Sequence, residues 1–219
     1  MNRLAIFDCD GTIVDSQANI CLAMEDCFAR AGLAAPRREM TRRVVGLSLV
    51  EAMQMMLPEA EPAFHITLAE DYKQAFHRLR GRGLVAEPLY DGIQDLIETL
   101  DADGWLLGVA TGKSDRGLGL CLEHHGLSKR FVTLQTADRH PSKPHPSMIE
   151  QALAEAGAAP ETSLMIGDTS YDMAMARAAG VTAIGVAWGY HEAEELLAAG
   201  AHHVAHHPSD IVELAKAIA

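Results

Sequence analysis

At residues 4–12 the chain reads Leu4-Ala5-Ile6-Phe7-Asp8-Cys9-Asp10-Gly11-Thr12. Residues 4–7 are all apolar, which is the pattern of a buried strand covered by helices on both faces. Two acids follow at positions i and i+2, and Gly11 permits the chain to turn there. These residues predict a strand whose carboxyl end directs Asp8 and Asp10 toward one pocket.

Beyond residue 85 the apolar pattern alternates between helices and strands. Such alternation forms βαβ units and a parallel sheet. We therefore expect an α/β fold with a doubly wound, Rossmann-like parallel sheet. The expected helices lie at 93–100, 117–125, 148–156, 171–179 and 211–218, and the expected strands at 105–110, 131–135, 163–166 and 181–186, with two short elements before the last helix.

Residues 16–85 contain helical patterns and no strand pattern. One helical stripe ends at Gly32, and another runs from Phe64 to Leu79 before Gly81 breaks it. The first strand is thus separated from the others by a block of helices. We expect a core domain built from residues 1–15 and 86–219, with an all-helical domain inserted at residues 16–85.

The composition is that of an ordinary globular protein. Apolar residues make up 48% of the 219 residues and charged residues 22%, which excludes disordered and fibrous classes. The formal net charge is −12, and such a surface repels nucleic acid and anionic membranes, so neither is expected as a partner. An anionic substrate would need a local cationic pocket and a bound metal.

Cysteine and histidine positions predict no metal or disulfide framework. The spacing of the four cysteines (Cys9, Cys21, Cys27 and Cys121) favours reduced thiols in a cytoplasmic protein. We expect no signal peptide. The sequence contains no run of about 18 apolar residues, so we also expect no membrane span. Four histidines near the C-terminus are expected at the surface: His202, His203, His206 and His207.

Ligands of an open parallel sheet bind beyond the carboxyl ends of its strands, and polar residues stand there in this chain. At the first strand, the Asp8 carboxylate can attack phosphorus and form an acyl phosphate. Asp10 can protonate the leaving oxygen and then activate a water. An Asx-turn or a helix cap explains an Asp-Gly pair equally well when the pair is taken alone.

Three later segments add groups suited to a phosphate and a metal. Thr111 and the backbone N–H of Gly112 can clamp a phosphate at a helix start, and Lys143 can neutralise phosphoryl oxygens. Asp168 and Asp172 offer the hard oxygens that Mg²⁺ prefers. Helix capping or a solvated lysine explains each group when it is taken alone, but their succession at strand ends favours an active site.

In this order the groups resemble the haloacid dehalogenase superfamily of phosphohydrolases, over essentially the whole chain. Four motifs carry the resemblance: Asp-x-Asp-Gly-Thr at 8–12, the strand-end Thr111, Lys143, and a Gly-Asp pair with a further acid at 168 and 172. The resemblance implies that Asp8 is the nucleophile and an Mg²⁺ ligand, and that Asp10 is the general acid/base with its backbone carbonyl on the metal. It also implies that Thr111, Gly112 and Lys143 bind the phosphoryl group, that Asp168 binds Mg²⁺, and that Asp172 orients metal waters or Lys143.

The inserted helices resemble the small C1-type helical cap of the phosphoglycolate phosphatase-like branch. Such a cap closes over the site and excludes water. Arg42, Arg43 and Gly46 resemble the substrate loop of that cap, where a guanidinium can meet a substrate carboxylate. Two solvated helix arginines are an equally good interpretation.

The expected function is Mg²⁺-dependent hydrolysis of small phosphorylated metabolites, with phosphoglycolate as the leading substrate and a monomer or homodimer as the assembly. Three differences argue against other members of the family. Dehalogenases lack the acid that this chain has at Asp10, and phosphonoacetaldehyde hydrolases need a lysine early in the cap, whereas the first lysine here is Lys73. β-Phosphoglucomutases carry a cap histidine at the position of Ile20. A pyrophosphatase or sugar-phosphate phosphatase of the same branch remains an alternative. So does a catalytically inactive phosphate- or metal-binding protein.

Overall fold

A six-stranded parallel sheet forms the centre of the core. The structure is a computed structural model, and it describes residues 2–218. The strand order is β3-β2-β1-β4-β5-β6, and every neighbouring pair is parallel. The strands are β1 (Asn2–Phe7), β2 (Leu106–Thr111), β3 (Thr133–Thr136), β4 (Ala158–Gly167), β5 (Thr182–Val186) and β6 (His203–Ala205).

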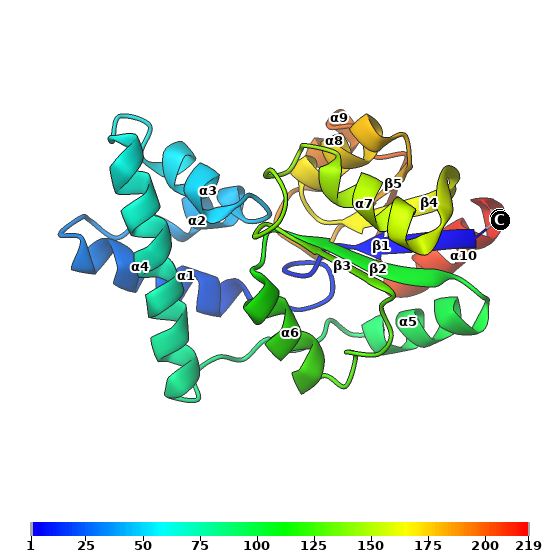
Figure 1. Ribbon diagram of the computed structural model, residues 1–219, viewed down its shortest axis with the longest axis horizontal. Helices are drawn as coiled ribbons and strands as arrows, with labels where there is room; N and C mark the ends of the chain where they lie inside the picture. Colours follow the sequence, from blue (N-terminus) through cyan, green and yellow to red (C-terminus); the bar gives the residue numbers. More distant parts are fainter. Residues whose placement is uncertain (1, 219) are drawn as a thin grey trace.

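Helices cover both faces of this sheet, which makes the core a three-layer structure (Figure 1). Ala5 and Phe7 pack on one face with α5 (Ile93–Ala102), α6 (Asp115–His124) and α10 (Pro208–Ile218). Leu4 and Ile6 point to the opposite face because successive strand side chains alternate. That face packs against α7 (Ser147–Ala156), α8 (Ser170–Ala179) and α9 (Ala193–Ala198).

Four helices form the insert between β1 and β2, here called the cap, and it stands at one end of the core (Figure 1). They are α1 (Gln17–Arg30), α2 (Arg38–Val44), α3 (Leu49–Met56) and α4 (Pro62–Gly81). The cap has an apolar centre of its own, in which Met24, Phe28, Met53, Leu68 and Tyr72 are buried. Burying such a side chain contributes about 1.5–3 kcal/mol, and these residues form a hydrophobic cluster separate from those on the two faces of the sheet.

The connectivity places a switch point beside β1. The chain passes from β1 to β2 and β3 on one side and then returns to β4 on the other side of β1. Phe7 is in register with Val109 of β2 and with Ile166 of β4. The residues that follow these three strands therefore meet in the crevice where ligands of doubly wound sheets bind.

The expected fold class is confirmed, and every expected helix and strand beyond residue 85 is present. β4 begins five residues earlier than the apolar pattern indicates, at Ala158 instead of Ser163. The four C-terminal histidines are exposed, as expected. No helix within residues 2–218 is long and apolar enough to cross a membrane.

Candidate active site

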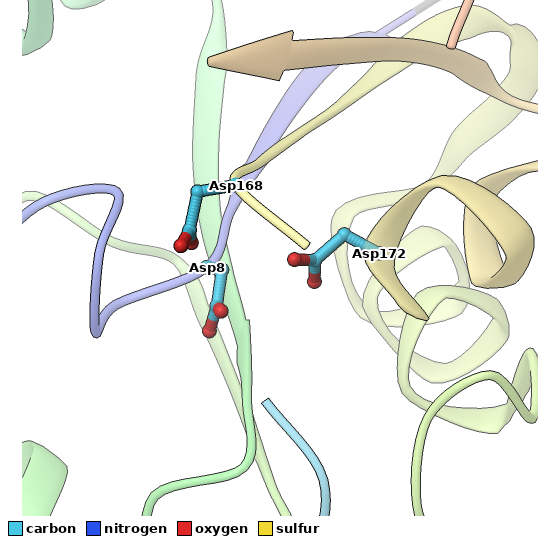
Figure 2. A group of neighbouring side chains, drawn as sticks. All are labelled: Asp8, Asp168 and Asp172. Atoms are coloured by element: carbon cyan, nitrogen blue, oxygen red, sulfur yellow. The ribbon is translucent and has the colours of Figure 1, made fainter. Parts of the chain in front are cut away.

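Three buried carboxylates meet at the switch point (Figure 2). Asp8 follows β1, Asp168 follows β4, and Asp172 lies in the first turn of α8. One oxygen of each carboxylate lies within 4.8 Å of those of the other two. The parallel register of β1 and β4 thus brings together residues that are 160 positions apart.

The two oxygens of Asp8 have different surroundings. Oδ1 accepts a hydrogen bond from the backbone N–H of Cys9 at 2.7 Å and lies 3.0 Å from Lys143 Nζ. Oδ2 is buried and has no hydrogen-bond partner among the residues that the structure describes. Leaving a buried polar atom unpaired is costly, so this oxygen is available to a reacting phosphorus or a cation.

Lys143 is the cation of this cluster, and its side chain is completely buried. Its Nζ lies 2.7 Å from Asp172 Oδ1. The other oxygen of Asp172 accepts hydrogen bonds from the Thr169 backbone N–H at 3.0 Å and hydroxyl at 2.7 Å, within the capping box that begins α8. Burial opposes the charged form of Lys143, but the Asp172 and Asp8 carboxylates raise its pKa above the ordinary value.

Asp168 is held by residues from two loops. Thr12 Oγ1 donates to Oδ1 at 2.8 Å, and the backbone N–H of Tyr190 donates to Oδ2 at 2.9 Å. Gly11 makes this approach possible, because it has a φ of +86° and a Cβ there would overlap the Asp168 carboxylate. The Asp-Gly-Thr part of the first motif is therefore shaped to receive Asp168.

The carboxylates repel one another and are poorly solvated. Burial is the main cause that raises the pKa of Asp8 to about 7, with Lys143 lowering it and Asp172 and Asp10 adding to the rise. Burial, then the charges of Asp8 and Asp172, raise the pKa of Asp168 well above its ordinary value. A divalent cation would relieve this repulsion, and the unpaired oxygen of Asp8 together with hard carboxylate donors fits such an ion.

Asp10 does not join the three carboxylates with its side chain. Its Oδ1 accepts a hydrogen bond from Ser16 and lies 2.6 Å from Lys113 Nζ. Lys113 also pairs with Glu87 at 2.9 Å, and Glu87 pairs with Arg80 of α4 at 2.9 Å. No role was expected for Lys113 or Glu87, although a lysine two residues beyond the strand-end Thr111 was a usable signal.

Comparison with known proteins agrees with this arrangement. A family model described as haloacid dehalogenase-like hydrolase matches residues 5–186. The chain belongs to this family. The resemblance inferred from the four motifs is thereby confirmed.

Full-length relatives of this haloacid dehalogenase-like hydrolase include phosphatases. A protein of Dickeya dadantii (strain 3937) named Probable phosphatase IndB is 33% identical over 220 residues, which span 100% of this chain and 95% of that protein. A phosphoglycolate phosphatase of Vibrio parahaemolyticus is 26% identical over 97% of this chain and 95% of that protein. The crystal structure of a hydrolase from Pseudomonas syringae superposes with a TM-score of 0.87 at 26% identity and 100% coverage of both chains. The chain is a phosphatase of the haloacid dehalogenase-like family.

The cap of this phosphatase lies directly on the predicted phosphate-binding loop. A Cβ at Gly112 would lie 2.8 Å from the carbonyl oxygens of Gly46 and Leu47 in the cap. The backbone N–H of Ser48 donates to the hydroxyl of Ser142 at 2.8 Å. The loop between α2 and α3 is thus closed against two core loops at once.

The predicted cap residues have different placements. Arg43 is exposed and pairs with Glu195 of α9, and its backbone carbonyl accepts a hydrogen bond from the Tyr171 hydroxyl at 3.0 Å. Neither Arg42 nor Arg43 lines the cavity beside Asp8, whereas Gly46 does. The structure therefore brings Gly46 to the site and directs Arg43 to the outside of the contact between cap and core.

A cavity of about 570 Å³ lies between the cap and the core. Asp8, Asp10 and Thr111 lie at its buried end, and Lys143 is directly behind Asp8. Asp8, Asp10 and Thr111 thus face one cavity, whose walls come from both the cap and the core.

Proposed function

We propose that this phosphatase hydrolyses phosphate monoesters of small metabolites through a covalent aspartyl phosphate on Asp8. The observation that carries the proposal is the state of the Asp8 carboxylate. Cys9 N–H and Lys143 hold Oδ1, while Oδ2 is buried without a partner among residues 2–218. A nucleophile oriented in this way needs little reorganisation before it attacks.

In the first step, Asp8 Oδ2 forms a bond to phosphorus while the bond from phosphorus to the ester oxygen breaks. Asp10, which lines the same cavity, donates a proton to the departing oxygen. In the second step, Asp10 takes a proton from the water that attacks phosphorus. The bond from phosphorus to Asp8 Oδ2 breaks, which frees the Asp8 carboxylate and gives inorganic phosphate. Each step returns Asp10 to the protonation state that the next step needs.

Positioning and charge neutralisation supply the other parts of the mechanism. Lys143, Thr111 and the backbone N–H of Gly112 bind the phosphoryl oxygens. Asp172 fixes Lys143 and does not touch the substrate, because both of its oxygens are engaged by Lys143 and Thr169.

Mg²⁺ is the cation that this donor set fits, held by Asp8, Asp168 and the backbone carbonyl of Asp10. When bound, it supplies positive charge that offsets the repulsion among the carboxylates and the phosphoryl oxygens. We further propose that residues 1–15 and 86–219 form the catalytic domain and that residues 16–85 form a cap that closes over it.

Phosphoglycolate is the first substrate to test, because a relative over nearly the whole chain carries that name. Pyrophosphate and sugar phosphates present the same reacting group and stand as the alternatives. The sequence argues against a catalytically inactive binding protein, because each of the four motifs retains its reactive side chain and these side chains lie in one site.

The test is phosphate release with and without Mg²⁺ from phosphoglycolate, pyrophosphate, sugar phosphates and phenyl phosphate. We expect Mg²⁺-dependent release by the wild type and none by Asp8→Asn, which keeps the size of the side chain. Rapid quenching followed by mass spectrometry should find one phosphoryl group on the peptide that contains Asp8. Wild-type turnover by Asp8→Asn, or a phosphorylated residue elsewhere, would refute the covalent mechanism.

A further inference from the structure

The cavity is larger than a two-carbon phosphate needs. Its volume of about 570 Å³ lies within the range of pockets that enclose drug-sized ligands, about 300–1,000 Å³. The lining changes from buried residues, such as Asp8 and Thr111, to exposed ones, such as His77 and Arg116. The cavity therefore runs from the reacting carboxylate out to a solvent-facing mouth.

More of the cavity wall is apolar than polar. Apolar side chains from three cap helices and from α6 of the core make up much of this wall. The wall includes Ile20, Met24, Leu49, Phe76 and Leu120. A leaving group that fills this space would have an apolar face or an alkyl chain.

The mouth carries a cation, Arg116, for which residues 2–218 provide no carboxylate partner. Arg116, at the start of α6, forms no ion pair with any residue in the range 2–218. The neighbouring acids are engaged elsewhere, since Glu70 pairs with Lys73 at 2.7 Å and Asp138 accepts the backbone N–H of Asp115 at 2.9 Å. This guanidinium, without an ion pair among the described residues, lies beside a cavity in a chain whose net charge is −12.

Arg116 also reaches across to the cap. Its guanidinium donates to Nδ1 of His77 on α4 at 3.4 Å, and Figure 1 shows α6 on the core side of α4. An anionic group bound by Arg116 would therefore lie at the contact between the two domains. Its binding would hold the cap in the closed position as well as orient the substrate.

We propose that Arg116 is a specificity-determining residue that binds a second anionic group, so that the preferred substrate is a phosphate monoester with an extended, partly apolar leaving group ending in a carboxylate or a second phosphate. This inference rests on the proposed function and adds to it the length and the distal charge of the substrate. Phosphoglycolate has a carboxylate, but it would fill only a small part of a cavity of about 570 Å³.

The test is a series of ω-carboxyalkyl phosphates of increasing length that begins with phosphoglycolate. Each acid is compared with its neutral amide, which matches it in size, and a second series ends in phosphate instead of carboxylate. We expect kcat/KM for the acid to exceed that for the amide by about tenfold or more at an intermediate chain length, mainly through KM. The series that shows the larger ratio identifies the distal group.

Variants connect this preference to one side chain. Arg116→Gln is expected to reduce the acid-to-amide ratio to about one. Arg130→Gln is the matched control, because Arg130 is an exposed core arginine paired with Asp101 and does not line the cavity. It should leave the ratio at its wild-type value.

The outcomes separate this inference from the proposed function. Three results would overturn the role of Arg116 alone. They are hydrolysis of all esters with no preference for the acid at any length, a preference for the acid that persists in Arg116→Gln, and an acid-to-amide ratio of kcat/KM that is highest for phosphoglycolate. A wild type that hydrolyses none of the esters with Mg²⁺ would overturn the proposed function and this inference with it.

Discussion

Lys113 Nζ lies 2.6 Å from Asp10 Oδ1, and the side chain of Lys113 is only 9% exposed. The same nitrogen lies 2.9 Å from Glu87, in the segment that leads from the cap back to the core. Burial opposes the charge on Lys113, but Asp10, followed by Cys9 and Glu87, raises its pKa well above the ordinary value. The proposed acid/base is thus held by a fixed cation.

Replacing Lys113 by methionine should destabilise the protein and misplace Asp10. Removing one partner of a buried ion pair costs about 3–5 kcal/mol, and here Asp10 would lose the cation beside it, whereas Glu87 would keep its ion pair with Arg80. We expect the free energy of unfolding to fall by about that amount in urea titrations. We expect kcat to fall by about a hundredfold, because a displaced acid/base loses its alignment.

Two further variants test this explanation. Adding Asp10→Asn to Lys113→Met should recover part of the lost stability, since Asp10 is the carboxylate that loses its cation while Glu87 keeps its ion pair with Arg80. Lys216→Met removes an exposed lysine paired with Glu213 and should leave stability nearly unchanged. An unfolding free energy of Lys113→Met equal to that of Lys216→Met would contradict the proposed importance of the buried pair.

The fold was predictable because both faces of the sheet are covered. Strands in that setting are apolar throughout, so β1, β2 and β5 stand out in the sequence. The first half of β4 did not, because it contains Pro160 and Glu161 and pairs irregularly with β1 near Asn2. Phe131 was assigned to β3, yet it lies before that strand and packs edge-on against Phe7, with 6.3 Å between the two ring centroids. The sequence thus indicates that Phe131 is buried, but it does not indicate whether this residue pairs within the sheet.

The candidate site was predictable wherever strand ends determine it. Parallel strands bring their carboxyl ends to one edge, so residues 8, 111 and 168 were expected to meet. The pairing of Asp10 with Lys113 and the outward direction of Arg43 were not predictable. Both depend on which partner lies within reach once the cap is seated, and these partners are 103 and 152 residues away.

The stability that Mg²⁺ adds should depend on pH. Folding raises the pKa of Asp8 from 3.8 to about 7, so between these values the folded chain holds a proton that the unfolded chain has released. The free energy of unfolding of the cation-free protein should therefore fall as pH rises from about 4 through 7. A cation binds the ionised carboxylates, so its stabilising effect should be small near pH 5 and larger near pH 8.

Thermal unfolding with Mg²⁺ or with a chelator, at several pH values, measures this effect. The increase in Tm on adding Mg²⁺ should grow with pH in the wild type. In Asp8→Asn it should be much smaller at every pH, because the repulsion and one ligand are both removed. An increment of constant size from pH 5 to 8 would show that these carboxylates do not hold the ion.

Seating of the cap should depend on Gly46 more than on Arg43. Gly46 has a φ of +96°, and a Cβ there would lie 3.1 Å from Thr169 Oγ1, so Gly46→Ala is strained in the closed position. We expect kcat/KM to fall about tenfold or more, with little change in the unfolding of the core. The ion pair of Arg43 with Glu195 is largely exposed, and Arg43→Ala or Glu195→Ala should each lower kcat/KM by less than about fivefold.

Substrate charge distinguishes the two possible roles of Arg43. If Arg43 only holds the cap through Glu195, then Arg43→Ala and Glu195→Ala should have equal effects, and the double variant should be no worse than either. The effects should also be equal for phosphoglycolate and for phenyl phosphate, which lacks a carboxylate. A loss in Arg43→Ala that is confined to phosphoglycolate would instead show that this arginine reaches the substrate, because only a direct contact can sense the carboxylate.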